Sequence, residues 1–141
     1  MPENLLQVYT DQAMEVFGDR ASREYYRRLG EERTLCGTRC VACDSVSLPP
    51  RGFCPDCFAA EVEWVDVGRH ATLHAFTTQA RALRFVKPAV IGVVEIPDVG
   101  LLVVPIEGRY DDLRIGQPLL LDVMDVEGGP PVPRFVPAGS E

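Results

Sequence analysis

Several chemically informative residues are scarce in this chain of 141 residues. It contains two histidines, one tryptophan and a single lysine, Lys87. It has no run of 18 apolar residues, so we expect no transmembrane helix. The N-terminal stretch 1–17 lacks the basic region of a signal peptide, which predicts a cytoplasmic protein.

Positive charge is also in short supply. The net charge is −7, from 21 acidic and 14 basic residues. An acidic chain repels a nucleic-acid backbone unless its few basic residues cluster. We therefore expect nucleic acid to be an unlikely partner.

The composition is otherwise ordinary, with 46% hydrophobic and 25% charged residues. The length suits one domain or two very small ones. Five cysteines are present, an odd number. Four of them form two close pairs in a chain without an export signal, and this pattern favours metal binding over a disulfide framework.

The paired cysteines predict a zinc ribbon. Cys40 and Cys43 form one C-x2-C pair, and Cys54 and Cys57 form the other after ten residues. Two such pairs, brought together by a turn at 49–52, supply the four thiolates of a tetrahedral Zn²⁺ site. Four protein ligands leave no open position, so we expect one structural zinc ion that does no chemistry.

An iron site is the competing metal interpretation, and a disulfide or chance pairing is the other alternative. Rubredoxin-type knuckles usually have Gly after the second cysteine, whereas this chain has Asp44 and Phe58 there. Asp tolerates a left-handed backbone and Phe does so poorly, which argues mildly against an electron-transfer site.

The remaining candidates for chemistry are Cys36, His70 and His74. Nothing in the sequence brings a base to Cys36, so we interpret it as a small, partly buried thiol beside the ribbon. In a regular strand, His70 and His74 share a face with Phe76, and we expect them to be ordinary surface or barrel-lining residues.

The chain divides into a helical segment at 1–33, a ribbon at 34–66 and a β-rich domain at 67–141. The first segment contains two helical stretches, the second with Ser22 as N-cap and Gly30 as its stop. Its arginines are expected to pair with nearby glutamates as a solvated face. The arginines are Arg20, Arg23, Arg27 and Arg28.

The β-rich part predicts a small barrel. Five strand candidates are punctuated by Gly and Pro, with a hairpin signal at 97–100 and a single helical turn at 110–116. This is the strand order of a five-stranded OB-fold. The predicted fold class is therefore mainly β with N-terminal helices, a rubredoxin-like zinc ribbon and an OB-fold barrel. The strand candidates are residues 70–79, 89–96, 101–107, 118–126 and 133–137.

Four sequence pieces in this order resemble a known family. They are LPPRGFCPDC at 48–57, EWVDVGRHATLHAFT at 63–77, RIGQP at 114–118 and PRFVPA at 133–138. The combination resembles the zinc-ribbon OB-fold family called domain of unknown function thirty-five. The resemblance covers roughly residues 20–138 and implies that the zinc ligands are Cys40, Cys43, Cys54 and Cys57.

The family resemblance also implies a function. Members are generally assembled with thiolase-like enzymes, lipid-transfer-type aldolases or MaoC-type hydratases, which act on acyl-CoA. We therefore expect a non-catalytic accessory subunit in a hetero-oligomer of acyl metabolism, first with a thiolase-like partner and otherwise with a hydratase or aldolase. The family supplies no catalytic residue.

Two further interpretations remain open. Zinc ribbons and OB-folds also bind nucleic acids, which need a basic groove with aromatic platforms. The loop between the first two barrel strands carries the basic run of the barrel region, so it is a candidate contact for a partner or for CoA phosphates, against an ordinary solvated loop. Its residues are Arg81, Arg84, Phe85 and Lys87.

Overall fold

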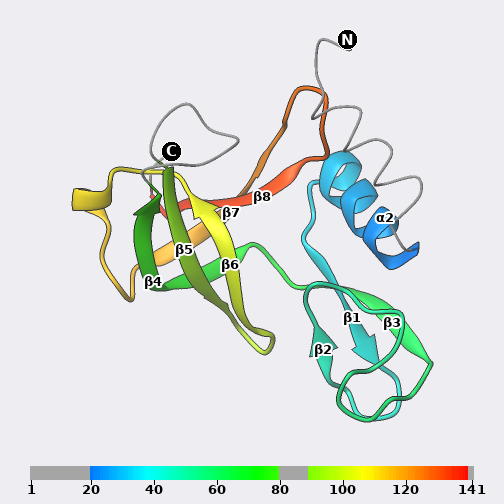
Figure 1. Ribbon diagram of the computed structural model, residues 1–141. Helices are drawn as coiled ribbons and strands as arrows, with labels where there is room; N and C mark the ends of the chain where they lie inside the picture. The colour runs from blue at the N-terminus through cyan, green and yellow to red at the C-terminus, as the bar shows by residue number, and fades with distance from the viewer. Residues whose placement is uncertain (1–19, 80–88, 140–141) are drawn as a thin grey trace. The chain divides into compact units, whose positions relative to one another are not determined.

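The computed structural model describes residues 20–79 and 89–139 (Figure 1). These residues form two compact units. The first contains the described chain up to Gly68 together with Val123–Val132, and the second contains Arg69–Asp122 and the chain from Pro133 onward. The helical stretch expected at 3–17 lies outside the described residues. The three-part division of the chain stays a prediction.

The first described element is a short helix, α2 (Arg20–Arg27), which widens into a π-helical turn, η2 (Arg28–Glu32). Ser22 lies inside α2, so its prediction as N-cap is wrong. The helical run also passes Gly30 and ends at Arg33, whose φ of 57° reverses the chain. Tertiary packing overrides the glycine stop here, because Leu29 is fully buried.

The first unit continues as a three-stranded antiparallel sheet in the order β2-β1-β3. Its strands are β1 (Cys36–Cys40), β2 (Val46–Ser47) and β3 (Val62–Asp66). Gly37 permits the close approach of β2, since a Cβ there would lie 2.5 Å from the Ser47 carbonyl oxygen. A bidentate ion pair at 2.8 and 2.6 Å joins Arg33 to Asp125, 92 positions later in the chain.

The second unit contains most of a closed five-stranded barrel, as the strand order predicted. Its strands are β4 (His70–Gln79), β5 (Ala89–Ile96), β6 (Gly100–Ile106), β7 (Pro118–Met124) and β8 (Val132–Pro137), in the order β4-β5-β6-β8-β7. The helical turn predicted between the third and fourth strands is the 3-10 turn η3 (Tyr110–Asp112). The barrel core includes Leu73, Val94 and Phe135.

A β-bulge in β4 changes which side chains face outward. The pairing with β5 shifts between Leu73 and Ala75, so His74 is an extra residue in the strand. Phe76 then lies opposite Gly92, whose position is buried, and its ring is 5.1 Å from that of Tyr110. The expectation that Phe76 shares a face with His70 and His74 is therefore wrong, because the bulge reverses the alternation.

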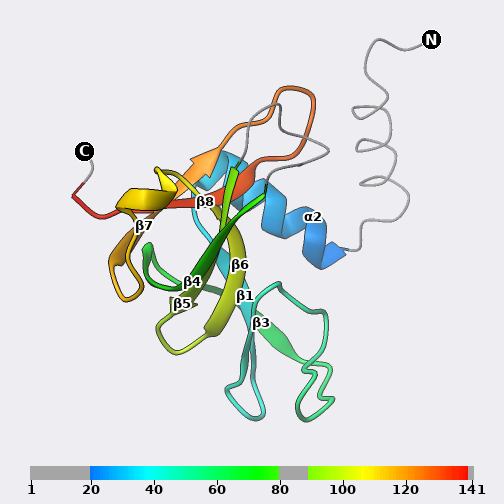
Figure 2. The same ribbon diagram turned by 60° about the vertical axis from the view of Figure 1, so that its left-hand side comes forward.

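The strands β4, β5 and β6 lie side by side in the barrel (Figures 1 and 2). After the bulge, their outer face carries a row of apolar side chains. Val93 of β5 lies opposite both Ala75 of β4 and Val103 of β6. Leu101, two residues before Val103, is 56% exposed, and Val103 itself is 67% exposed. We call Ala75, Val93, Leu101 and Val103 the outer apolar row.

In the described part of the chain, no helix has the length and apolar character needed to cross a membrane.

Candidate metal centre and adjoining cavity

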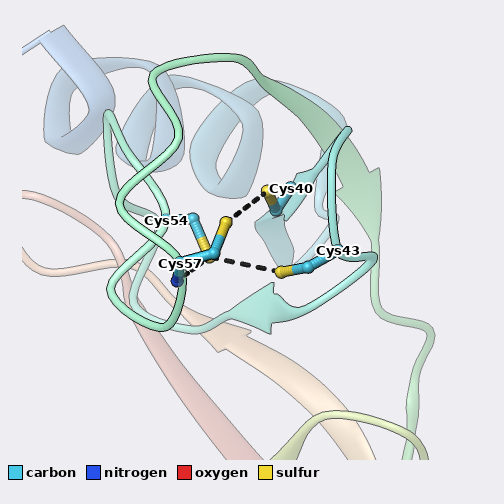
Figure 3. A group of neighbouring side chains, drawn as sticks. All are labelled: Cys40, Cys43, Cys54 and Cys57. Carbon is cyan, nitrogen blue, oxygen red and sulfur yellow. Dashed lines mark hydrogen bonds between the residues drawn. The ribbon is translucent and has the colours of Figure 1, made fainter.

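The two C-x2-C pairs meet at one point of the first unit (Figure 3). All four sulfur atoms lie within 4.8 Å of one another. The Sγ atoms of Cys40 and Cys57 are 3.5 Å apart, and those of Cys43 and Cys54 are 3.6 Å apart. Four sulfurs at about 2.3 Å from a tetrahedral zinc ion would be about 3.8 Å from one another. The arrangement therefore fits a single zinc ion.

Both cysteine pairs lie in turns with the same hydrogen-bond pattern. In the first, the Asp44 N–H donates to the Cys40 carbonyl at 2.9 Å, and in the second the Phe58 N–H donates to the Cys54 carbonyl at 2.9 Å. Each turn is closed by a further 2.9 Å bond, from the Cys40 N–H to the Ser45 carbonyl and from the Cys54 N–H to the Ala59 carbonyl. The protein thus presents two matched cysteine knuckles.

The residue after each pair adopts the left-handed backbone that glycine usually supplies. Asp44 and Phe58 both have φ of 63°. The knuckle geometry is therefore retained despite the missing glycines, and the argument from Phe58 against an iron site does not hold. Phe58 is 77% exposed, so packing of its ring offsets only part of its backbone strain.

Backbone N–H donors favour the thiolate form of Cys54. The Cys57 N–H, 3.5 Å from the Cys54 sulfur, lowers the pKa of Cys54 to about 7. A backbone hydrogen bond from Ser45 also lowers the pKa of Cys43. Hydrogen bonds with neighbouring sulfurs, that of Cys54 first, outweigh this effect and raise the pKa of Cys43 to about 12. Without a cation, closely spaced sulfurs resist joint ionisation, and a bound divalent ion removes that conflict.

Cys36 lies at the start of β1 and is buried. Its Sγ shares a 3.4 Å hydrogen bond with the Thr34 hydroxyl, which suits a structural thiol. His70 and His74 are both exposed on β4, as expected for surface residues. The other predicted contact residues, Arg81, Arg84, Phe85 and Lys87, lie outside the described residues, and their role stays a prediction.

A cavity of about 640 Å³ adjoins the ribbon in the first unit. It is lined by one face of α2 and by residues from the ribbon, among them Arg51 and Trp64. Sequence reasoning did not identify these two residues. The sequence does not predict that they line one cavity, because the cavity forms only when the ribbon folds against α2.

Two models of known protein families match consecutive parts of this chain. A model described as "ChsH2, rubredoxin-like zinc ribbon domain" matches residues 27–63, and one described as "ChsH2, C-terminal OB-fold domain" matches residues 64–123. Together they cover more than half of the chain. The chain belongs to the DUF35 family of zinc-ribbon OB-fold proteins. Its zinc-ribbon match and its four close sulfurs are consistent with one structural zinc ion.

Two solved structures resemble this DUF35 protein. A structure titled "Ltp2-ChsH2(DUF35) aldolase" superposes with a TM-score of 0.75 at 25% identity, covering 85% of this chain and 96% of the other. A DUF35 protein of unknown function from Sulfolobus solfataricus superposes with a TM-score of 0.62 at 18% identity, covering 95% and 98%. The second likeness concerns the fold alone.

A curated relative is also similar in sequence. The "Probable enoyl-CoA hydratase alpha subunit" of Thermomonospora curvata is 26% identical over 117 residues, which is 81% of this chain. The match spans 37% of the relative's own length. Two of the three similar proteins are thus named as a hydratase subunit and as an aldolase containing a DUF35 part.

Proposed function

We propose that this DUF35 protein is a non-catalytic accessory subunit of an acyl-CoA-processing enzyme. The observation that carries the proposal is its similarity to proteins named as a hydratase subunit and as the DUF35 part of an aldolase. The zinc site agrees with a supporting role, because four thiolates fill the coordination sphere and leave no position for substrate.

The outer apolar row supports a protein partner. Val103 and Leu101 on β6 are large aliphatic residues that remain mostly exposed, and Val93 extends the apolar surface onto β5. Adjacent exposed apolar side chains of this kind mark interaction surfaces more often than isolated ones do. We propose that the row contacts the catalytic subunit, since covering it removes apolar surface from water.

The partner's class follows from the relatives. Their names favour a hydratase or an aldolase as the catalytic subunit. The thiolase-like partner expected from the sequence remains a third candidate. In each case the partner supplies the reacting groups, and this chain supplies surface and stability.

The test is co-expression with the hydratase-, aldolase- or thiolase-like protein encoded beside it. We expect a stable complex whose acyl-CoA turnover depends on this chain. Val103→Glu should prevent assembly while the melting temperature stays unchanged. Ile115→Glu is the matched control, because Ile115 is 72% exposed and lies outside the row.

Two results would count against the proposal. Full activity of every candidate partner in the absence of this chain would refute the accessory function. Normal assembly of the Val103→Glu protein would refute the outer apolar row as the contact.

A further inference from the structure

The cavity beside α2 concentrates positive charge in an acidic protein. Arg20, Arg23 and Arg27 of the helix line it together with Arg51 of the ribbon, and among the described residues of the lining only Glu24 carries a carboxylate. The chain as a whole carries a net charge of −7. A cluster of arginines in a concave site favours an anionic ligand.

Part of this positive charge is neutralised by ion pairs between neighbouring residues of the helical segment. Glu24 accepts hydrogen bonds from Arg27 at 2.7 and 3.0 Å and from Arg28 at 2.8 Å. The same two arginines lower the pKa of Glu24 to about 2, with Arg27 contributing most. Arg27 also bonds to Glu31 at 3.0 Å. The expected pairing of arginines with glutamates is therefore confirmed for Arg27 and Arg28.

Two other arginines of the lining, Arg20 and Arg51, differ from Arg27 in their ion pairing. Within residues 20–79 and 89–139, the structure records no ion pair for the side chain of Arg20 or of Arg51. The backbone of Arg51 is held in place, because its N–H donates to the buried Thr38 hydroxyl at 2.9 Å. The backbone of Arg51 is thus anchored, and its guanidinium group is available to a ligand.

The cavity also has an aromatic wall. Trp64 of β3 lines it, and the guanidinium group of Arg28 lies over one face of the indole ring, 5.1 Å from the ring centre. An indole offers a flat surface on which a purine base stacks, while arginines bind phosphate oxygens with two parallel hydrogen bonds. A volume of about 640 Å³ is within the usual range for small-molecule sites.

We propose that this cavity binds the phosphorylated adenosine end of coenzyme A, with Arg20 and Arg51 on the phosphates and Trp64 against the adenine. The assignment to coenzyme A rests on the proposed function, whereas the preference for a phosphorylated purine rests on the cavity. The accessory subunit would then anchor the nucleotide end of the substrate and leave the acyl end to the catalytic subunit.

The single tryptophan of the chain makes a direct test available, because Trp64 is the only source of tryptophan emission. The zinc-loaded full chain is titrated with coenzyme A, adenosine 3′,5′-bisphosphate, pantetheine, inorganic phosphate and a single-stranded oligonucleotide. We expect saturable quenching by coenzyme A and by the bisphosphate, weaker binding of phosphate, and no response to pantetheine.

Charge reversals locate the site. Arg20→Glu and Arg51→Glu should each weaken binding of the bisphosphate at least tenfold. Arg109→Glu makes the same charge change on an exposed residue of the barrel outside the cavity lining, and it should change affinity less than twofold.

Three outcomes would overturn the proposal. They are the absence of saturable quenching by coenzyme A and the bisphosphate, equal affinity in the Arg51→Glu protein, and tighter binding of the oligonucleotide than of coenzyme A. Assembly of the wild-type chain with the partner enzyme, measured separately, reports on the proposed function. A wild-type chain that assembles normally but shows no saturable nucleotide binding leaves the proposed function intact and refutes this site alone.

Discussion

Replacing Phe58 tests how the second cysteine knuckle is built. The side chain is 77% exposed, so about a quarter of its surface is buried in the folded protein. For an aromatic side chain of about 200 Å² this contact contributes about 1 kcal/mol. The φ of 63° opposes folding, because a left-handed conformation costs a non-glycine residue about 1–2 kcal/mol.

These two contributions separate in a pair of variants. Phe58→Ala loses the ring contact and keeps the backbone strain, so its free energy of unfolding should fall by about 1 kcal/mol. Phe58→Gly loses the same contact and is relieved of the strain, while its greater chain entropy costs about 0.5–1 kcal/mol. The glycine variant should therefore be more stable than the alanine variant by about 1 kcal/mol.

The measurement is urea unfolding of zinc-saturated protein, followed by circular dichroism. Both variants keep all four cysteines, so zinc content should stay the same. Glu61 serves as the control, since it is exposed in the same ribbon and its φ is not positive. There the order should reverse, with Glu61→Ala more stable than Glu61→Gly. An alanine variant at position 58 that matches or exceeds the glycine variant would show the strain argument to be wrong.

Two further predictions concern the metal and the barrel. Cys54→Ser should lose the metal and unfold the ribbon, because metal binding and folding are coupled, and metal analysis with circular dichroism checks this; full retention of zinc and stability would contradict it. Gly92→Ala should destabilise the barrel by about 1–3 kcal/mol through overpacking, because a Cβ there would lie 2.5 Å from the Ile106 side chain. Gly52→Ala is the control, because a Cβ at position 52 meets nothing within 4 Å. The control variant should unfold at nearly the wild-type denaturant concentration. Equal stability of the two glycine variants would refute the packing argument.

The sequence was most informative where a pattern is local. The five strand-forming runs at 70–79, 89–96, 101–107, 118–126 and 133–137 and the helical turn before Gly116 all predicted real elements, because alternation and turn residues act over a few positions. The cysteine spacing likewise predicted the sulfur cluster.

Other features depend on contacts distant in sequence. The bulge at His74 breaks a regular alternation and is imposed by pairing with β5, so the strand's own residues did not reveal it. Phe58 takes a conformation its residue type disfavours because the knuckle requires it. The helix runs beyond Gly30 because burial of Leu29 outweighs a local stop signal.

The return of Val123–Val132 to the first unit has a consequence for biosynthesis. Arg33 leaves the ribosome 92 positions before its ion-pair partner Asp125, a delay of roughly 5–20 s at usual translation rates. The first unit is therefore complete only after the strands β4 to β7 have been synthesised. A fragment ending at Asp122 would contain every cysteine and still lack Val123–Val132, the part of their unit that is synthesised after those strands.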